Sequence, residues 1–205
     1  MDYRDAHRQL QDRYDTRRLA DRLAEMAAAE VGAYRDFIEA RDMFFLATAD
    51  ADGNPQCSYK GGDPGFVRVI DDATIAFPVY DGNGMFLSVG NLSENPSVGM
   101  LFVDFADGSR LRLNGTASVD PGDALTPTFP GAMLVVRVRA REVFANCRRY
   151  VHTHGDADRS VFVPRPGEPP PVPDWKRHDW FDGTLSADDP AHDPEMPSAP
   201  SFPRF

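Results

Sequence analysis

The fold is decided by one stretch of the chain, which reads Met43-Phe44-Phe45-Leu46-Ala47-Thr48-Ala49, then Asp50-Ala51-Asp52-Gly53-Asn54-Pro55, then Gln56-Cys57-Ser58-Tyr59. The first segment is a short apolar run, which is typical of a buried strand. The second segment is rich in Asp, Gly, Asn and Pro, and such a cluster is a strong turn signal. The sequence therefore predicts a β-hairpin in which the third segment returns beside the first.

Further strands are expected after this hairpin, over residues 66–70, 74–77, 98–105, 110–114 and 133–140. One or two helical turns are predicted over 85–92, and Asn95-Pro96 ends them because a residue before proline avoids the helical region. A pattern of about six strands with short turns and few central helices indicates a closed antiparallel barrel. The fold class is therefore mainly β with flanking helices (α+β).

The chain is expected to fall into three parts. Residues 1–40 form an N-terminal helical arm, in which Leu19, Leu23 and Met26 make one apolar stripe. Residues 41–150 form the barrel domain. Residues 151–205 form a Pro-rich C-terminal extension, because residues 164–205 hold 11 of the 18 prolines, and we expect it to be extended or partly disordered.

The charge balance excludes some partners. With 32 acidic and 22 basic residues the net charge is −10, which argues against nucleic acids and anionic membrane surfaces, since both require a basic surplus. No signal peptide or run of ~18 apolar residues is present, and two separated cysteines make no disulfide framework. A reduced, cytoplasmic protein is expected. His152 and His154 lack a third ligand, so no metal site is predicted.

The first candidate binding segment is Ser58-Tyr59-Lys60-Gly61-Gly62, with Arg68 eight residues after the lysine. A hydroxyl, a cation and a glycine-rich turn after a strand are the groups that a phosphate monoester requires. The alternative is a solvated hairpin loop with an ordinary surface lysine.

Two further candidates follow along the chain. The loop and helix over residues 81–91 carry Asn83, Ser88 and Asn91, and backbone amides at the helix start can bind an anion. The alternative is a helix capped by its own polar residues. Arg110 and Arg112 share one face of an alternating strand, where they can bind a ligand or form ion pairs with the plentiful acids.

Three motifs together resemble a known family. Residues 44–49 with Asp52-Gly53-Asn54-Pro55 resemble the opening hairpin of the FMN-binding split barrels related to pyridoxamine 5′-phosphate oxidase. Residues 91–102 resemble the family's short helix that closes in Asn-Pro and feeds a strand. Residues 111–117 resemble its strand that ends in a Gly-x-Ala turn. The order and spacing agree, and the likeness covers about residues 37–119.

The resemblance implies an antiparallel split β-barrel that forms a homodimer with FMN in the groove between the subunits. By position, Ser58, Tyr59, Lys60 and Arg68 lie on strands that reach the flavin. Asn83, Ser88 and Asn91 lie on the phosphate side, and Arg110 can reach the ring edge. Two features depart from the oxidases: Leu87 and Ser88 stand where these carry an Arg-Lys pair, and no Arg-x-His occurs.

The implied function is an FMN-binding oxidoreductase that acts on a small molecule and is not a true pyridoxamine-phosphate oxidase. An F420-dependent reductase is an allied alternative. A non-enzymatic flavin-binding or redox-sensing module is another, and a haem-binding split barrel would need His152 or His154 as an axial ligand. The sequence singles out no catalytic acid or base, and it identifies neither the substrate nor the electron donor.

Overall fold

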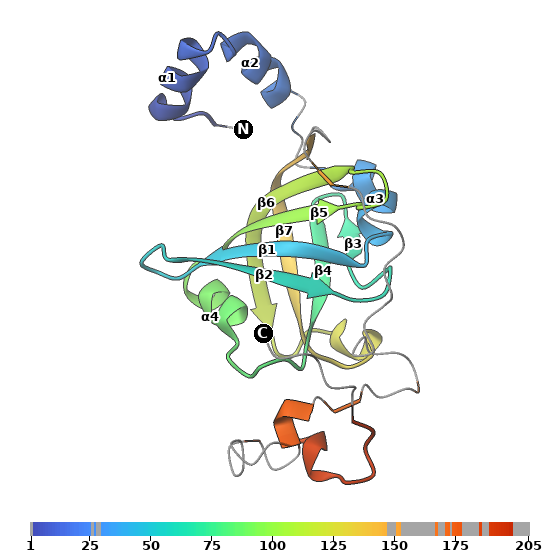
Figure 1. Cartoon of the computed structure of the whole chain (residues 1–205). Coiled ribbons are helices and arrows are strands. Elements are labelled where there is room, and N and C mark those ends of the chain that lie inside the picture. The colour runs from blue at the N-terminus through green and yellow to red at the C-terminus, as the bar shows by residue number, and fades with distance from the viewer. Residues whose placement is uncertain are drawn as a thin grey trace. The chain divides into compact units, whose positions relative to one another are not determined.

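The computed structural model describes residues 2–25, 27, 30–146 and 151–152, and in the C-terminal part residues 167, 171–172, 174–177, 185 and 189–198. The chain divides into two compact units, Met1–Asp156 and Ala157–Phe205 (Figure 1). The helical elements are α1 (Asp5–Arg13), α2 (Arg17–Glu25), η1 (Gly32–Tyr34), α3 (Arg35–Glu39), α4 (Leu87–Glu94), η2 (Thr126–Thr128), η3 (Asp174–Arg177) and η5 (Pro190–His192). The strands are β1 (Met43–Ala49), β2 (Pro55–Gly61), β3 (Arg68–Asp71), β4 (Thr74–Tyr80), β5 (Ser97–Val103), β6 (Arg110–Asp120) and β7 (Ala132–Asn146).

One antiparallel sheet of seven strands forms the body, in the order β2-β1-β5-β6-β7-β4-β3. The predicted hairpin of β1 and β2 is confirmed, with Met43 opposite Gly61 and Ala49 opposite Pro55. The two edge strands, β2 and β3, do not pair with each other within the described residues. The closed barrel expected from the strand pattern is therefore not formed, and the antiparallel split β-barrel that the resemblance implied is confirmed.

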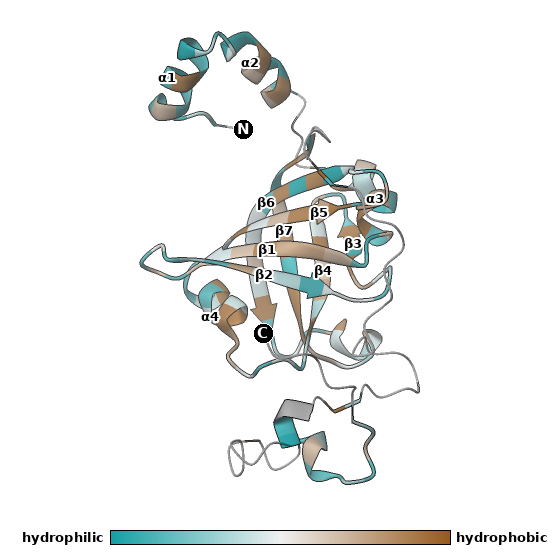
Figure 2. Ribbon diagram, in the orientation of Figure 1, coloured by the Kyte–Doolittle hydropathy of each residue, from teal (hydrophilic) through white to brown (hydrophobic). Residues whose placement is uncertain are grey.

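The sheet curls around an aromatic core. Phe44 on β1 contacts three other rings, those of Phe66, Phe77 and Phe102, with ring centroids 5.0 to 5.8 Å apart. Burial alternates along β6, where Leu111, Leu113 and other inward residues are covered and their neighbours are not. Figure 2 shows this alternation as bands along the strand. The period of two predicted for this segment is what places every second side chain in the core.

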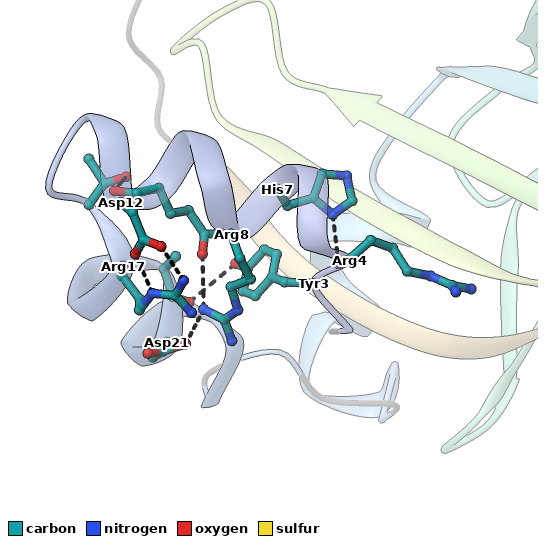
Figure 3. A network of polar contacts seen from close by, with 10 residues as sticks. Tyr3, Arg4, His7, Arg8, Asp12, Arg17 and Asp21 are labelled. Atoms are coloured by element: carbon teal, nitrogen blue, oxygen red, sulfur yellow. Dashed lines mark hydrogen bonds and ion pairs between the residues drawn. The ribbon is translucent and has the colours of Figure 1, made fainter.

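Residues 1–40, which the sequence predicted to form a helical arm, contain α1 and α2 and, further on, η1 and α3. A break separates α1 from α2. The break falls at Tyr14–Thr16, where Asp15 adopts a left-handed φ of 49°. Arg8 of α1 donates to Gln11 and to Asp21 of α2, and Arg17 donates to Asp12 (Figure 3). These polar contacts hold the two helices together, while Leu19 and Leu23 of the predicted apolar stripe remain 60% and 48% exposed.

The described residues of the C-terminal unit contain a buried ion pair. Lys176 donates to Asp189 at 2.9 Å, with both side chains largely covered, and the same carboxylate caps η5 by accepting from the Ala191 amide. Val172 forms a bridge with Ser198. The prolines of the extension are therefore accompanied by local packing. No helix in the described part of the chain is both long and apolar enough to cross a membrane.

A second ion pair fixes the loop before β7 and should make the free energy of unfolding depend on pH. Arg137 binds Asp123 through two hydrogen bonds, which hold the pKa of that carboxyl below its usual range. The stabilisation is fully present above pH ~4 and is lost as the pH falls through the lowered pKa of Asp123. We expect Asp123→Asn to lower the free energy of unfolding at pH 7 by about 1–2 kcal/mol, because the guanidinium remains partly solvated.

The measurement is urea unfolding at pH 7 and again at pH 3. The difference between the wild-type protein and Asp123→Asn should shrink as the pH falls, since the wild-type carboxyl becomes protonated. An equal difference at both values would mean that the ion pair does not carry the effect.

Candidate functional site

A groove of about 270 Å³ is lined by β2, the end of β4, the loop that leads into α4 and the first turn of that helix. Figure 1 shows where these elements lie in the fold. Its lining residues come from two stretches of the chain, 56–60 and 79–89. They are Gln56, Cys57, Ser58, Lys60, Val79, Tyr80, Gly82, Asn83, Gly84, Phe86, Leu87, Ser88 and Val89. Four of the eight predicted binding residues, namely Ser58, Lys60, Asn83 and Ser88, are thus brought together. Concave sites that combine apolar walls with a few polar groups are where small ligands bind.

A hydroxyl pair joins two sides of the groove. Ser58 on β2 and Ser88 in the first turn of α4 are hydrogen-bonded at 3.1 Å, although they are 30 residues apart in sequence. Either hydroxyl can be the donor, so the pair can turn a free hydrogen toward a bound oxygen. Ser58 and Lys60 are two residues apart on a strand and therefore share a face.

Lys60 is the one side chain with a full charge among the described residues that line the groove. It is half-buried, and burial lowers the pKa of its amine. No carboxylate or other hydrogen-bond acceptor in the described chain binds this amine. A half-buried cation without an anion is unfavourable for the fold, and an anionic ligand would compensate for that cost.

The N-terminus of α4 adds donors to the same wall. The residue before the helix, Phe86, makes no side-chain cap, and the first helical hydrogen bond runs from the Gly90 amide to the Phe86 carbonyl. The backbone N–H groups of Leu87, Ser88 and Val89 consequently have no acceptor among the described residues. Uncapped amides at a helix start favour negative charge.

Phe86 itself is in an unusual conformation. Its φ of 50° lies in the left-handed region, which an aromatic residue rarely adopts and which costs of order 1 kcal/mol. Met85, Phe86 and Leu87 are 61%, 45% and 48% exposed, and the last two line the groove. Backbone strain together with exposed apolar side chains at a groove is typical of a binding site rather than of the core.

The other predicted binding residues lie elsewhere on the barrel. Tyr59 points to the opposite face of β2 and packs edge-on against Phe45, while Asn91 donates to the Thr48 hydroxyl and fastens α4 to β1. These two side chains are not among the residues that line the groove.

The two predicted arginines are also absent from the groove lining. Arg68 donates twice to Thr128, and its guanidinium lies 3.7 Å from the centre of the Phe129 ring. Arg110 lies on β6 opposite Val103 and Asn146.

The sequence did not single out Tyr80, Phe86 or Leu87 as lining residues. Tyr80 is at the end of β4, where burial, helped by the charge of Asp63, raises the pKa of its phenol. The phenol therefore stays protonated at neutral pH and can donate a hydrogen bond into the groove. Only the fold brings the end of β4 next to β2, so no local pattern around Tyr80 could have indicated this.

Comparison with solved structures finds partial similarity. HupZ of Group A Streptococcus is 21% identical to this chain with a TM-score of 0.45, over 59% of this chain and 95% of that one. An F420 reductase is 18% identical with a TM-score of 0.41, over 54% and 94%. A FAD-binding protein of Mesorhizobium loti is 16% identical with a TM-score of 0.40, over 56% and 92%.

A comparison with curated proteins finds no match. The family model described as pyridoxamine 5′-phosphate oxidase, in contrast, matches residues 31–166, which span the whole sheet and the groove. The chain therefore belongs to the pyridoxamine 5′-phosphate oxidase family.

Proposed function

We propose that this protein is an oxidoreductase that binds a flavin nucleotide, FMN or the deazaflavin F420, in the groove between β2, β4 and α4. The observation that carries the proposal is the convergence of half-buried Lys60, which has no partner in the described part of the chain, with the Ser58–Ser88 hydroxyl pair. Together they supply the charge and the donors that a phosphate needs, on a chain whose net charge is −10.

The other residues of the groove lining suit the ring and the chain of a flavin nucleotide. Phe86, Leu87 and Val79 supply apolar surface for a planar ring, and Tyr80 and Asn83 can donate hydrogen bonds. When bound, the flavin supplies the hydride chemistry, and the protein contributes binding and orientation.

The test is the visible spectrum of the protein as isolated, with mass spectrometry of the released ligand. We expect flavin or deazaflavin absorbance that NADPH, NADH or reduced F420 bleaches. A flavin that none of these donors reduces would favour the non-enzymatic module instead. A Soret band, or protein that binds neither flavin nor deazaflavin when these are added, would contradict the proposal.

A homodimer is the second part of the proposal, and the outer face of the hairpin supports it. Two rows of mostly apolar residues cross β2, β1 and β5: Tyr59, Phe45 and Leu101 form one row, and Cys57, Ala47 and Gly99 form the next. Tyr59 is 62% exposed and Ala47 is also exposed. Such a patch is typical of a surface that a partner covers, and a second copy would extend the groove that begins at Cys57 and Ser58.

We expect Ala47→Arg to make the protein monomeric, because the long cation would be buried in the centre of the interface. The affinity for FMN should fall by about tenfold or more, equal to ~1.4 kcal/mol, if both subunits line the site. Sedimentation velocity gives the oligomeric state, and flavin fluorescence gives the dissociation constant and any release on dilution. Ala51→Arg, in the exposed turn of the same hairpin, is the control. A monomer that retains flavin with unchanged affinity would refute the shared site.

A further inference from the structure

The two helices of the N-terminal arm, α1 and α2, contact each other through polar and small side chains. Four residues of α2 are partly covered, and they share one face of the helix: Arg17, Ala20, Asp21 and Ala24. In α1 only Arg8 and Gln11 are partly covered. Figure 3 shows the polar contacts that join the two helices. Neither helix has a buried residue, so this contact provides no apolar core for the arm.

The large apolar side chains of the arm lie outside this contact. Leu19 and Leu23 are one turn apart on a different face of α2 from the partly covered residues, and both are exposed. Leu10 and Tyr14 are also one turn apart, and they are 56% and 67% exposed. Two nine-residue helices are too short to be stable in water alone, because most helical stability comes from packing of an apolar face. The arm therefore needs a partner that covers its apolar side chains.

The charges at the two ends of α2 are the reverse of those that a helix dipole favours. Arg17 and Arg18 are in the first turn, which has no acidic residue, and Glu25 is the last residue. A helix favours acids at its start and bases at its end. Arg18 and Glu25 form ion pairs with Asp15 and Arg22, but these pairs are exposed and contribute little to stability.

We propose that the arm of one copy pairs with the arm of a second copy, with the two α2 helices antiparallel and Leu19 of each packed against Leu23 of the other. Twofold symmetry fixes the rest of the register. Arg17 then faces the other copy's Glu25 at both ends of the contact, and Arg18 is one residue away. Each Glu25 would lie beside the arginine-bearing start of the other helix, where the dipole favours an acid.

The charge of the arm fits a second copy better than other partners. Residues 1–25 hold six arginines, five aspartates and one glutamate, so the arm is neutral, whereas the whole chain carries −10. Two arms can approach without the repulsion that acts between acidic surfaces. Anionic membranes and nucleic acids attract a basic surplus, which the arm lacks. Because two arms alone bury less than a stable interface requires, their pairing adds to contacts that the copies make through the barrel.

The first test is Leu19→Gln together with Leu23→Gln in the full-length protein. Glutamine keeps the helix propensity of leucine and removes the apolar surface. Sedimentation velocity over a dilution series gives the protein concentration at which the largest assembly is half dissociated. We expect this concentration to rise by about tenfold or more, because apolar contacts are lost at both ends of the twofold.

Met133→Gln is the control, since it removes a comparably exposed apolar side chain from β7 and should leave the half-dissociation concentration unchanged. If the double leucine variant assembles like the wild-type protein, the inference is overturned. That result together with a lower free energy of unfolding would mean that the leucines pack within their own chain. A wild-type protein that is monomeric throughout the dilution series would overturn the inference as well.

A charge exchange distinguishes a second arm from any other occupant. Arg18→Glu and Glu25→Arg each bring like charges together at both ends of the contact, so each should raise the half-dissociation concentration about threefold or more. The variant with both changes has the net charge of the wild-type protein and should return to within about twofold of it. Neutral substitutions at these positions should change little, because an exposed ion pair contributes little. If the leucine variant weakens assembly but the double charge variant does not restore it, the arm binds another surface and the proposed pairing is wrong.

Discussion

Lys60→Met should weaken flavin nucleotide binding by about 2–3 kcal/mol, or roughly 30- to 150-fold in the dissociation constant. The substitution keeps the apolar stem of the side chain and removes the one full charge among the described residues that line the groove. The ligand's phosphate would then be left with hydroxyls and amides only. Quenching of flavin fluorescence on titration measures the effect, and riboflavin, which has no phosphate, should lose almost nothing.

Stability should change in the opposite direction. Burial lowers the pKa of Lys60, so the folded state carries a charged amine that would be better hydrated in the unfolded chain. This cost is fully present at pH values below the lowered pKa and disappears as the pH rises through the ordinary pKa of lysine. Lys60→Met should therefore unfold at a urea concentration equal to or higher than that of the wild-type protein at pH 7.

The matched control is Arg18→Met, which changes the net charge equally at a fully solvated position of α2. It should leave both flavin affinity and stability as they are. If both variants weakened flavin binding alike, a general electrostatic effect would be responsible and Lys60 would have no special role. A Lys60→Met protein with wild-type affinity for FMN would remove the groove as the phosphate site.

The fold could be predicted from the sequence wherever the signal was local. The hairpin of β1 and β2 followed from an apolar run and a turn cluster, and the alternation of β6 predicted which face of that strand is buried. The last two strands were predicted too short. The sequence predicted strands over 110–114 and 133–140, whereas β6 extends to Asp120 and β7 covers Ala132–Asn146. Their extra length is fixed by pairing between the two strands, which is a tertiary effect that no single segment encodes.

The strand pattern alone did not predict that the sheet stays open, whereas the family resemblance implied the split form. Whether β2 and β3 meet depends on the curvature accumulated over all seven strands, and here they do not. The missing pairing between β2 and β3 matters for the site. Because β2 is an edge strand, no neighbouring strand covers the groove beside Ser58 and Lys60.

The candidate site was predictable in its charged and hydroxyl members and not in its apolar ones. Lys60, Ser58 and Ser88 carry chemistry that can be recognised from residue type, and the fold brings them to one groove. Phe86 looked like an ordinary apolar residue before a helix. Its left-handed backbone is a property of the loop's path, so only the coordinates single it out.

Gly115→Ala should lower the free energy of unfolding by about 3 kcal/mol, which is the upper end for overpacking a filled interior. The pairing of β6 with β7 shifts register at Gly115: Asn114 lies opposite Glu142, but Gly115 lies opposite Ala140. A Cβ on this residue would lie 2.3 Å from the Arg139 carbonyl oxygen and 3.1 Å from a Val138 methyl group. Because the nearest obstacle is backbone, the strands would have to separate to accept even one methyl group.

Gly90→Ala is the control, since a Cβ there meets nothing within 4 Å and the residue is inside α4. Alanine in place of an unstrained helical glycine should stabilise the protein by about 0.5–1 kcal/mol. Urea unfolding of both variants is monitored by far-ultraviolet circular dichroism, which reports on the sheet. The comparison distinguishes a local backbone clash from a general intolerance of alanine. A Gly115→Ala protein as stable as the wild type would mean that β6 and β7 do not pack as closely at this point as the register requires.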